Sequence, residues 1–319
     1  MALYLGKAAK QKAVACTEAA EKGSLVVIAD FDRTITQCFL PDGGRGCSAH
    51  GVLDGSSLLS EDWRAKTKVL FDKYFPIEID PKMSVEEKIP LMTEWYTQVH
   101  TLMLGQGITR DQLKSVVAAC STIQLREGFA DFVKCCQEAH PPIPVLIMSA
   151  GLGDVIEEFL RLALPFLVAP TTMVVSNRFH FDESGRMVGF SEPLLHMFNK
   201  SAAWLPPAAK HLVEGRTHCL LLGDGVGDVT MADGLQMEVL RVGFLNEKIE
   251  EKLSHFREIF DVVKTHDGPV PGICFQAIGK SCGLSLSSLS QTRRLTFTVI
   301  GVTCLALALF AYRRAAFKV

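Results

Sequence analysis

The sequence lacks the features that mark several specialised classes of protein. Its 319 residues include 33 basic and 35 acidic side chains, with no block of either sign and a net charge of −2. A strongly basic surface that binds polynucleotides is therefore excluded, although a single phosphate group needs only a local pocket. There is no internal repeat, and a content of 48% hydrophobic residues predicts an ordinary globular protein. The composition does not determine its oligomeric state.

Ten cysteines are present, but no two of them form a C-x-x-C pair. This pattern favours a reducing compartment over a disulfide framework. Cys47 and His50 have the spacing of half a zinc site, yet no second pair stands at a compatible spacing. We therefore expect a loop cysteine beside a loop histidine and no structural zinc.

The two ends of the chain differ in charge pattern. Residues 1–22 carry lysines and glutamates among alanines, which predicts a surface helix and excludes a secretory signal. Residues 295–312 (LTFTVIGVTCLALALFAY) carry no charge and are bracketed by arginine pairs. About eighteen residues at roughly 1.5 Å each give about 27 Å of helix, just enough for a hydrocarbon core.

These observations predict a C-terminal transmembrane helix that acts as a tail anchor. A serine-rich linker, residues 279–294, would precede it, and a short basic tail, residues 313–319, would follow it. Such an anchor holds the preceding domain on the cytosolic face of an intracellular membrane, with the mitochondrial outer membrane favoured and the endoplasmic reticulum left open. A buried core helix is the alternative, but flanking arginines and an apolar surface all round suit lipid better.

Three apolar runs of strand length end at polar or glycine residues. They are SLVVIAD at 24–30, PVLIMSAG at 144–151 and HCLLLGD at 218–224. Each precedes a turn and a helical pattern, which is typical of buried parallel strands in an α/β fold. We expect a Rossmann-like parallel sheet formed by residues 23–37 and 126–278, with its ligand site at the carboxyl ends of the strands.

A long segment with helical periodicity, residues 38–125, interrupts this sheet and predicts an inserted helical cap. Ser84 and Glu87 form a capping-box pattern that begins a helix running to Leu104, with a bend at Pro90. Further on, RFHFDESGRMVGF alternates around a central turn, as a β-hairpin does.

Aspartates follow two of the predicted strands. Asp30 and Asp32 come directly after the first strand in DFDRT, and Asp224 and Asp228 follow the third in GDGVGD. Crowded carboxylates suit a hard cation such as Mg²⁺, and one free oxygen could attack phosphorus. For each pair alone the alternative is structural, an Asx turn in the first case and a glycine-rich turn in the second.

Two further segments offer groups that bind phosphate. The second strand ends in Ser149-Ala150-Gly151, where a hydroxyl and backbone N–H groups precede a helix starting near Asp154. Lys200, in HMFNKSAAW, would supply a cation, although most isolated lysines are simply solvated.

In this order, the motifs DxDxT, Ser, Lys and GDxxxD resemble those of the haloacid dehalogenase-like phosphotransferase superfamily, whose fold is a Rossmann-like sheet with a mobile cap. Longer strings resemble the cytosolic pyrimidine 5′-nucleotidase (type III) family over roughly residues 23–263. These strings are PIEIDPKMSVEEKIPLMTEWYTQVH, SAGLGDVIEEF, GFSEPLLHMFNK and LLGDGVGDVTMADG.

The resemblance implies a role for each of these polar residues. Asp30 would be the nucleophile that forms an aspartyl-phosphate, and Asp32 would protonate the leaving nucleoside oxygen and later activate water. The ligands of Mg²⁺ would be the carboxylates of Asp30 and Asp224 and the backbone carbonyl of Asp32. Asp228 would support the ion indirectly, without direct contact. The groups that bind phosphate oxygens would be Ser149, the backbone of Ala150 and Lys200.

In the cap, the resemblance implies that Glu78 accepts hydrogen bonds from the base, while His50 and Tyr96, with Phe39, sandwich it. Without the resemblance, a solvated face would explain Glu78, and plain packing would explain Tyr96 and Phe39. The loop after the first aspartates reads CSAHG, with an apparent one-residue insertion before it, where the family has a string close to CPTCHN. Val99 replaces a family serine that contacts the base, which leaves the choice between pyrimidine and 7-methylguanosine monophosphates open.

Together these features predict a Mg²⁺-dependent enzyme that hydrolyses nucleoside 5′-monophosphates to nucleoside and phosphate. One alternative is a phosphatase for a small metabolite such as phosphoserine, although Glu78 with aromatic neighbours argues for a base. A second is a membrane-tethered nucleotide-binding protein without turnover, against which the intact Asp30, Asp32, Lys200 and Asp224 argue.

Overall fold

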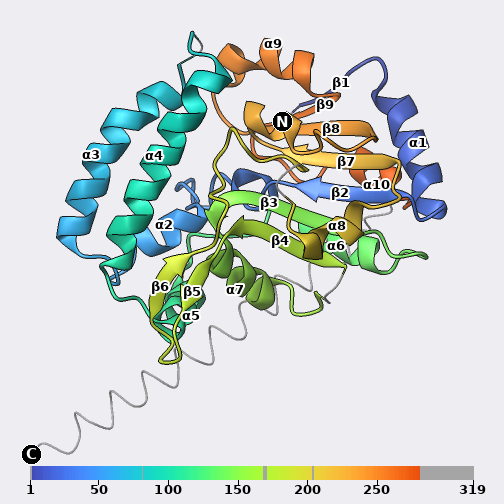
Figure 1. The fold of residues 1–319 in the computed structure, drawn as a ribbon. Helices are drawn as coiled ribbons and strands as arrows, with labels where there is room; N and C mark the ends of the chain where they lie inside the picture. Colours follow the sequence, from blue (N-terminus) through green and yellow to red (C-terminus); the bar gives the residue numbers. More distant parts are fainter. Residues whose placement is uncertain (1, 81, 168–170, 203–204, 281–319) are drawn as a thin grey trace, which may run out of the picture. The chain divides into compact units, whose positions relative to one another are not determined.

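The computed structural model describes residues 2–80, 82–167, 171–202 and 205–280 (Figure 1). Within these residues, no helix is both long and apolar enough to cross a membrane. The predicted anchor at 295–312, the tail after it and all but the start of the linker before it lie outside the described residues, so these assignments stay predictions.

The core of the described chain is a seven-stranded sheet in the order β1-β9-β8-β7-β2-β3-β4. Only β1 runs antiparallel to its neighbour β9, and the other neighbours pair in parallel. The predicted parallel α/β sheet is therefore confirmed, whereas the short edge strand β1 was not predicted. The strands are β1 Leu3–Leu5, β2 Leu25–Ala29, β3 Val145–Leu152, β4 Thr172–Asn177, β7 His218–Gly223, β8 Glu238–Leu245 and β9 Val262–Thr265.

Both faces of this sheet are buried, which explains why its strands are continuous apolar runs. In β2, Leu25, Val27 and Ala29 pack into one hydrophobic cluster, and the alternate residues Val26 and Ile28 pack into the other. The first cluster contains residues of α1 (Ala9–Glu21), α6 (Phe129–Gln137), α7 (Gly153–Ala163) and α10 (Gly272–Ala277). The second contains residues of α8 (Pro207–Val213) and α9 (Ile249–Ile259).

Four helices between β2 and β3 form the predicted insertion, and we call them the cap. They are α2 Ala49–Asp54, α3 Glu61–Glu78, α4 Val85–Leu104 and α5 Arg110–Ala119. Figure 1 shows α3 and α4 side by side, on the side to which the arrow of β2 points. The predicted capping box at Ser84 and Glu87 is confirmed, and Pro90 lies inside α4. The predicted hairpin is formed by β5 (Phe179–Phe181) and β6 (Met187–Phe190).

Two segments join the cap to the sheet, and we call them the entry linker (residues 36–48) and the exit linker (residues 120–125). They run beside each other, because Thr36 pairs with Leu125 in an antiparallel bridge. The amide of Gln37 donates to the carbonyl of Gln124, and a further backbone bond joins the linkers at Cys47 N and Thr122 O, both at 2.9 Å. Motion of the cap relative to the sheet therefore requires these two paired linkers to bend.

Candidate active site

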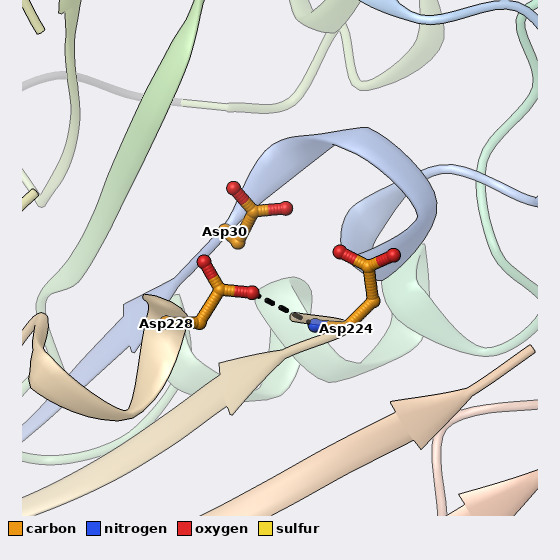
Figure 2. Close-up of side chains that lie close together, drawn as sticks. All are labelled: Asp30, Asp224 and Asp228. Atoms are coloured by element: carbon orange, nitrogen blue, oxygen red, sulfur yellow. Dashed lines mark hydrogen bonds between the residues drawn. The ribbon is translucent and has the colours of Figure 1, made fainter. Parts of the chain in front are cut away.

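The carboxyl ends of β2 and β7 bring three aspartates together. Asp30 follows β2 directly, Asp224 follows β7, and Asp228 lies in the short helical turn Val226–Thr230. Because β2 and β7 are parallel neighbours, these ends meet at one edge of the sheet. One carboxylate oxygen from each aspartate lies within 4.8 Å of the others (Figure 2).

The loop after β7 is shaped by one of its own aspartates. Asp228 Oδ2 accepts hydrogen bonds from the amides of Asp224 at 3.0 Å and Gly225 at 2.8 Å. A Cβ on Gly223 would lie 2.4 Å from the Cβ of Asp228, so only glycine allows this close approach. The sequence GDGVGD therefore folds back on itself and presents the carboxylate of Asp224 beside Asp30.

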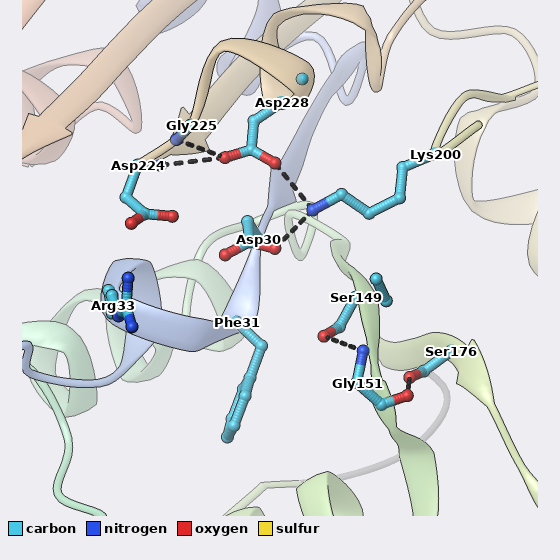
Figure 3. Close-up of polar contacts among 12 residues, drawn as sticks. Asp30, Phe31, Arg33, Ser149, Gly151, Ser176, Lys200, Asp224, Gly225 and Asp228 are labelled. Carbon is cyan, nitrogen blue, oxygen red and sulfur yellow. Dashed lines mark hydrogen bonds and ion pairs between the residues drawn. The ribbon is translucent and has the colours of Figure 1, made fainter. Parts of the chain in front are cut away.

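Lys200 is the buried cation of the site, with only 4% of its surface exposed. Its ammonium group donates to Asp30 Oδ1 at 2.5 Å and contacts Asp228 Oδ1 at 2.7 Å (Figure 3). Burial opposes the charge of Lys200, but the two carboxylates outweigh it and raise the pKa of Lys200 above its usual value. Lys200 is therefore a fixed positive charge against the predicted nucleophile.

The acidic cluster has three carboxyl groups against the single ammonium group of Lys200. Burial raises the pKa of Asp30 to about 7 against the attraction of Lys200. Burial, with repulsion from Asp30 and Asp228, raises the pKa of Asp224 well above its usual value. Among the described residues this is the one group of His, Cys, Asp or Glu side chains that could hold a metal ion. Three clustered carboxyl oxygens, whose protons a divalent cation can displace, fit a hard ion such as Mg²⁺.

Asp32 is held apart from this cluster, on the turn Phe31–Ile35, and faces the cap. Its Oδ1 accepts a hydrogen bond of 2.8 Å from the amide of Ala49, the first residue of α2. Burial raises the pKa of Asp32 to about 6, although the bond from Ala49 opposes this shift. The Asp32 carboxyl can therefore exchange a proton near neutral pH, whereas its side chain is not among the clustered oxygens.

The end of β3 packs beside α2, the first helix of the cap. Ser149 is 2% exposed, and its hydroxyl accepts a bond of 3.0 Å from the amide of Gly151. The carbonyl of Ala150 accepts from Asn177 Nδ2 at 2.9 Å, so the side chain of Asn177, at the end of the neighbouring strand β4, holds this strand end in place. A Cβ on Gly151 would lie 2.8 Å from the Cβ of Ala49 and 3.5 Å from Asp32 Oδ2, which places Gly151 directly beside the start of α2.

The cap brings Glu78, His50 and Tyr96 toward the same region. Glu78 ends α3, and burial raises its pKa to about 6 despite Lys88 and Arg33. Burial, followed by the charge of Glu78, raises the pKa of Tyr96, so the two side chains are electrostatic neighbours. The rings of His50 and Tyr96 are perpendicular at 6.2 Å, so they form a corner and not the parallel pair that a sandwich requires.

Phe39 is not brought to this corner. It lies in the entry linker, is 37% exposed, and its amide donates to Asp267 Oδ2 at 2.7 Å. No ring contact joins Phe39 to His50 or Tyr96 in the described part of the chain. Its amide therefore ties the entry linker to the core, and the residue is exposed.

Two arginines with no role predicted from the sequence, Arg126 and Arg33, lie beside the site. Arg126 is 1% exposed and donates to the carbonyls of Thr34 at 2.6 Å, of Gly268 at 2.7 Å and of Arg33. Arg33 has a left-handed backbone, with φ of 61°, and its charge lowers the pKa values of Asp32 and Glu78 against burial. A signal was available for Arg33, which lies inside the DxDxT motif itself.

His196 joins the cap to the segment that carries Lys200. It is fully buried, its Nε2 lies 3.3 Å from the hydroxyl of Thr93 on α4, and its ring lies 6.3 Å from that of Tyr96. Burial lowers its pKa to about 4, so the ring is neutral. Its position four residues before Lys200 was the one signal in the sequence.

Known proteins are similar to this chain in sequence and in fold. Residues 33–275 match the family described as Pyrimidine 5'-nucleotidase (UMPH-1). The chain is 42% identical to a 7-methylguanosine phosphate-specific 5'-nucleotidase A of Xenopus laevis over 246 residues, which cover 76% of this chain and 83% of that one. It is 40% identical to the 7-methylguanosine phosphate-specific 5'-nucleotidase of Homo sapiens over 246 residues, which cover 76% and 80%.

A solved structure extends the match to three dimensions. The crystal structure of cytosolic 5'-nucleotidase IIIB bound to cytidine superimposes with a TM-score of 0.76 at 30% identity, covering 87% of this chain and 93% of that one. The matches in sequence and in fold therefore agree over most of both chains. The chain belongs to the pyrimidine 5'-nucleotidase family, is an enzyme of the 5'-nucleotidase class, and has a haloacid dehalogenase-like core.

Proposed function

We propose that this enzyme hydrolyses nucleoside 5′-monophosphates to nucleoside and phosphate through an aspartyl-phosphate on Asp30. The observation that carries the proposal is the pairing of two carboxyls with different surroundings. Asp30 is held against Lys200 at 2.5 Å, and Asp32 accepts one backbone bond and faces the cap. Two carboxyls in separate environments can act as nucleophile and as acid–base group in one reaction.

In the first half of the reaction, an oxygen of Asp30 attacks phosphorus and the bond to the nucleoside O5′ breaks. Oδ2 of Asp30 accepts no hydrogen bond from the described residues, so it is the free oxygen of the pair. Asp32 gives its proton to the leaving O5′, which the raised pKa of about 6 makes available near neutral pH. Lys200 offsets negative charge as phosphate approaches the carboxylate.

In the second half, water attacks the phosphorus of the aspartyl-phosphate, and the bond to the Asp30 oxygen breaks. Asp32, now deprotonated, takes a proton from that water and returns to its starting state. The hydroxyl of Ser149 and the backbone of Ala150 are proposed to bind phosphate oxygens in both halves. Division into two displacements replaces one difficult step by two easier ones.

Mg²⁺ is the proposed cofactor, held by Asp30, Asp224 and the backbone carbonyl of Asp32. Asp228 is proposed to support it indirectly, because both of its oxygens already bind protein groups. When bound, the ion supplies positive charge that neutralises phosphate oxygens.

The base is proposed to lie in the corner formed by His50 and Tyr96, with Glu78 accepting from its amino group. No hydrogen bond to the carboxylate of Glu78 is made by the described residues, so both oxygens are free to accept one. Relatives named for 7-methylguanosine phosphate and a relative bound to cytidine support a substrate with an exocyclic amino group. We therefore propose cytidine and 7-methylguanosine monophosphates as substrates.

A panel of phosphate esters assayed with and without Mg²⁺ tests this proposal. We expect phosphate release from nucleoside 5′-monophosphates that depends on Mg²⁺, and much slower release from phosphoserine and sugar phosphates. Faster turnover of a small metabolite would reject the nucleotide as substrate. Nucleotide binding without phosphate release would reject the reaction itself.

We also propose that the hydrophobic segment 295–312 anchors the enzyme to an intracellular membrane with its catalytic domain in the cytoplasm. The span is uncharged between arginine pairs, and the catalytic motifs lie before residue 280. Full-length protein should stay in the pellet after a carbonate wash, whereas a chain ending at residue 290 should be released with unchanged kinetics. Release of both forms would reject the anchor.

A further inference from the structure

Two free cysteines meet where the cap joins the core. The sulfurs of Cys47 and Cys120 lie 3.8 Å apart, although 73 residues separate them in sequence. Both side chains are half-buried, and neither belongs to a disulfide. A disulfide has a sulfur–sulfur distance of about 2.05 Å, so the two sulfurs need to approach by less than roughly 2 Å.

The two cysteines lie on different linkers of the cap. Cys47 is in the entry linker, one residue before Ser48, which caps α2. Cys120 begins the exit linker and is the C-cap of α5. The backbone around them is already paired, because the amide of Cys47 donates to the carbonyl of Thr122 at 2.9 Å. A bond between the sulfurs would tie the two linkers together covalently.

Cap motion matters because the candidate active site is buried and is bonded to the first cap helix. Asp30 is 6% exposed and Lys200 is 4% exposed, and Asp32 accepts from the amide of Ala49 on α2, so we expect a nucleotide to enter with a displacement of the cap. The entry linker also leads into Ala49, whose amide bonds to Asp32, and into His50. Tying the linkers would therefore restrict the hinge and hold the start of α2 at the site.

We propose that Cys47 and Cys120 form an oxidative modification site, which a small disulfide such as glutathione disulfide converts to an intramolecular disulfide that restrains the cap. A cytoplasmic disulfide of this kind is a reversible sensor, in contrast to the structural bridges of secreted proteins. Its formation does not depend on the proposed hydrolysis, because no catalytic group takes part.

The reaction is two thiol–disulfide exchanges. Burial raises the pKa of the Cys47 thiol to about 12, which disfavours its thiolate, so we assign the first attack to Cys120. The Cys120 thiolate attacks glutathione disulfide, releases one glutathione and forms a mixed disulfide. Cys47 then loses its proton and attacks the Cys120 sulfur, which releases the second glutathione. Two protein thiols are oxidised, and one glutathione disulfide is reduced to two glutathiones.

Mass spectrometry of the full-length protein tests the site directly. The protein is incubated with glutathione disulfide, free thiols are alkylated, and the chain is digested without reduction. We expect a cross-linked pair of peptides containing Cys47 and Cys120, with both thiols lost from alkylation and restored by dithiothreitol. Alkylation of both cysteines, or a stable mixed disulfide with glutathione, would overturn the proposal.

Variants separate this pair from general thiol oxidation. Cys47→Ser and Cys120→Ser should each abolish the cross-link, whereas Cys135→Ser, at a half-buried cysteine on α6, should leave it intact. Formation of an equivalent cross-link through Cys135 in the Cys47→Ser chain would show that the contact is not specific. The single-serine variants also serve as reduced references that cannot be locked.

Hydrogen exchange measures the effect on the cap. Oxidised wild-type protein should exchange the amides of residues 36–48 and 120–125 more slowly than reduced protein, and Cys120→Ser should show no such difference. Equal exchange in the two forms, with the disulfide present, would overturn the restraint. Nucleotide turnover, which rests on the proposed function, should fall on oxidation and recover with dithiothreitol. Unchanged kcat and KM would show that the tie does not limit the cap.

Discussion

The two ends of the candidate active site are built in different ways. At the core end, Asp30, Lys200 and Asp228 are nearly fully buried and joined by ionic contacts of 2.5 and 2.7 Å. At the cap end, Glu78 and Tyr96 are half-buried, and the carboxylate of Glu78 accepts no hydrogen bond within the described residues. One end is a tight charged network, and the other is an aromatic corner with one free acceptor.

In the proposed function, this difference assigns the reaction to the core end and the choice of base to the cap end. Charges fixed in a buried site interact strongly and are already oriented for a phosphate, which suits the bond-making end. Burial lowers the pKa values of His50 on α2 and of His196, which contacts α4, to about 4, so both rings stay neutral at neutral pH. Changes in the core should therefore remove turnover, whereas changes in the cap should alter which base is preferred.

Asp30→Asn should produce the largest effect, because an amide is a far poorer nucleophile and metal ligand than a carboxylate. We expect kcat to fall by several orders of magnitude in a protein that still folds. Steady-state kinetics measures the loss, and an unchanged circular dichroism spectrum is the control. Near-wild-type turnover by the folded variant would contradict the proposed mechanism. It would also mean that the reaction does not depend on the core end of the site.

Mg²⁺ should stabilise the core end in a pH-dependent way. Burial raises the pKa of Asp30 to about 7 and that of Asp32 to about 6, both from 3.8. The folded chain therefore holds more protons than the unfolded chain between about pH 4 and pH 7. These groups favour folding below that window, and their contribution is lost as the pH rises through it. Mg²⁺ replaces the protons, so it should stabilise the fold more at about pH 8 than at about pH 5.5.

At a Mg²⁺ concentration one hundred times its Kd, we expect the free energy of unfolding to rise by about 2.7 kcal/mol. Urea unfolding with and without MgCl₂ at the two pH values measures the difference. Asp224→Asn is the matched control, because it removes one proposed ligand while leaving Lys200 and Asp30 in place. Equal stabilisation at both pH values would contradict the competition between Mg²⁺ and protons.

Glu78→Gln should change selectivity at the cap end without abolishing hydrolysis. A hydrogen bond to a charged acceptor contributes about 1.5–3 kcal/mol, or roughly 10- to 150-fold in selectivity. The measurement is the ratio of kcat/KM for cytidine monophosphate to that for uridine monophosphate. An unchanged ratio would mean that Glu78 does not contact the base, and a loss of kcat for both substrates would mean that the cap takes part in the reaction.

Thr93→Val should produce the smallest effect, because it removes one hydrogen-bonding hydroxyl at nearly constant volume. Thr93 Oγ1 lies 3.3 Å from His196 Nε2, and a neutral bond of this kind contributes about 0.5–1.5 kcal/mol. We expect KM to change by less than about tenfold and kcat to stay near its wild-type value. A fall in kcat of two orders of magnitude would show that this contact also positions Lys200, which follows His196.

Much of the core end could be predicted from the sequence because its residues are local to strand ends. Asp30, Ser149 and Asp224 each follow a continuous apolar run, and parallel strands place such ends at one edge. The same rule says nothing of Lys200, which reaches the cluster from a segment without regular structure. Its position was predicted from the family resemblance, not from periodicity.

The cap end was less predictable because its residues come together only through helix packing. Phe39 was grouped with His50 and Tyr96, yet its amide is bonded to Asp267 of the core, 228 residues away. His196 was missed because its partner, Thr93, lies 103 residues earlier on a cap helix. No local pattern encodes such pairings, which depend on how the cap folds back over the sheet.

The sequence by itself determined the parallel sheet, the cap helices and the acidic residues at the strand ends, since apolar periodicity and capping residues act over a few neighbours. The tertiary structure decided which groups meet. It brings Lys200 against Asp30 at 2.5 Å, turns Asp32 to the amide of Ala49, and places Cys47 beside Cys120. These contacts join residues far apart in the chain, so they arise only when the sheet edge, the linkers and the cap pack together.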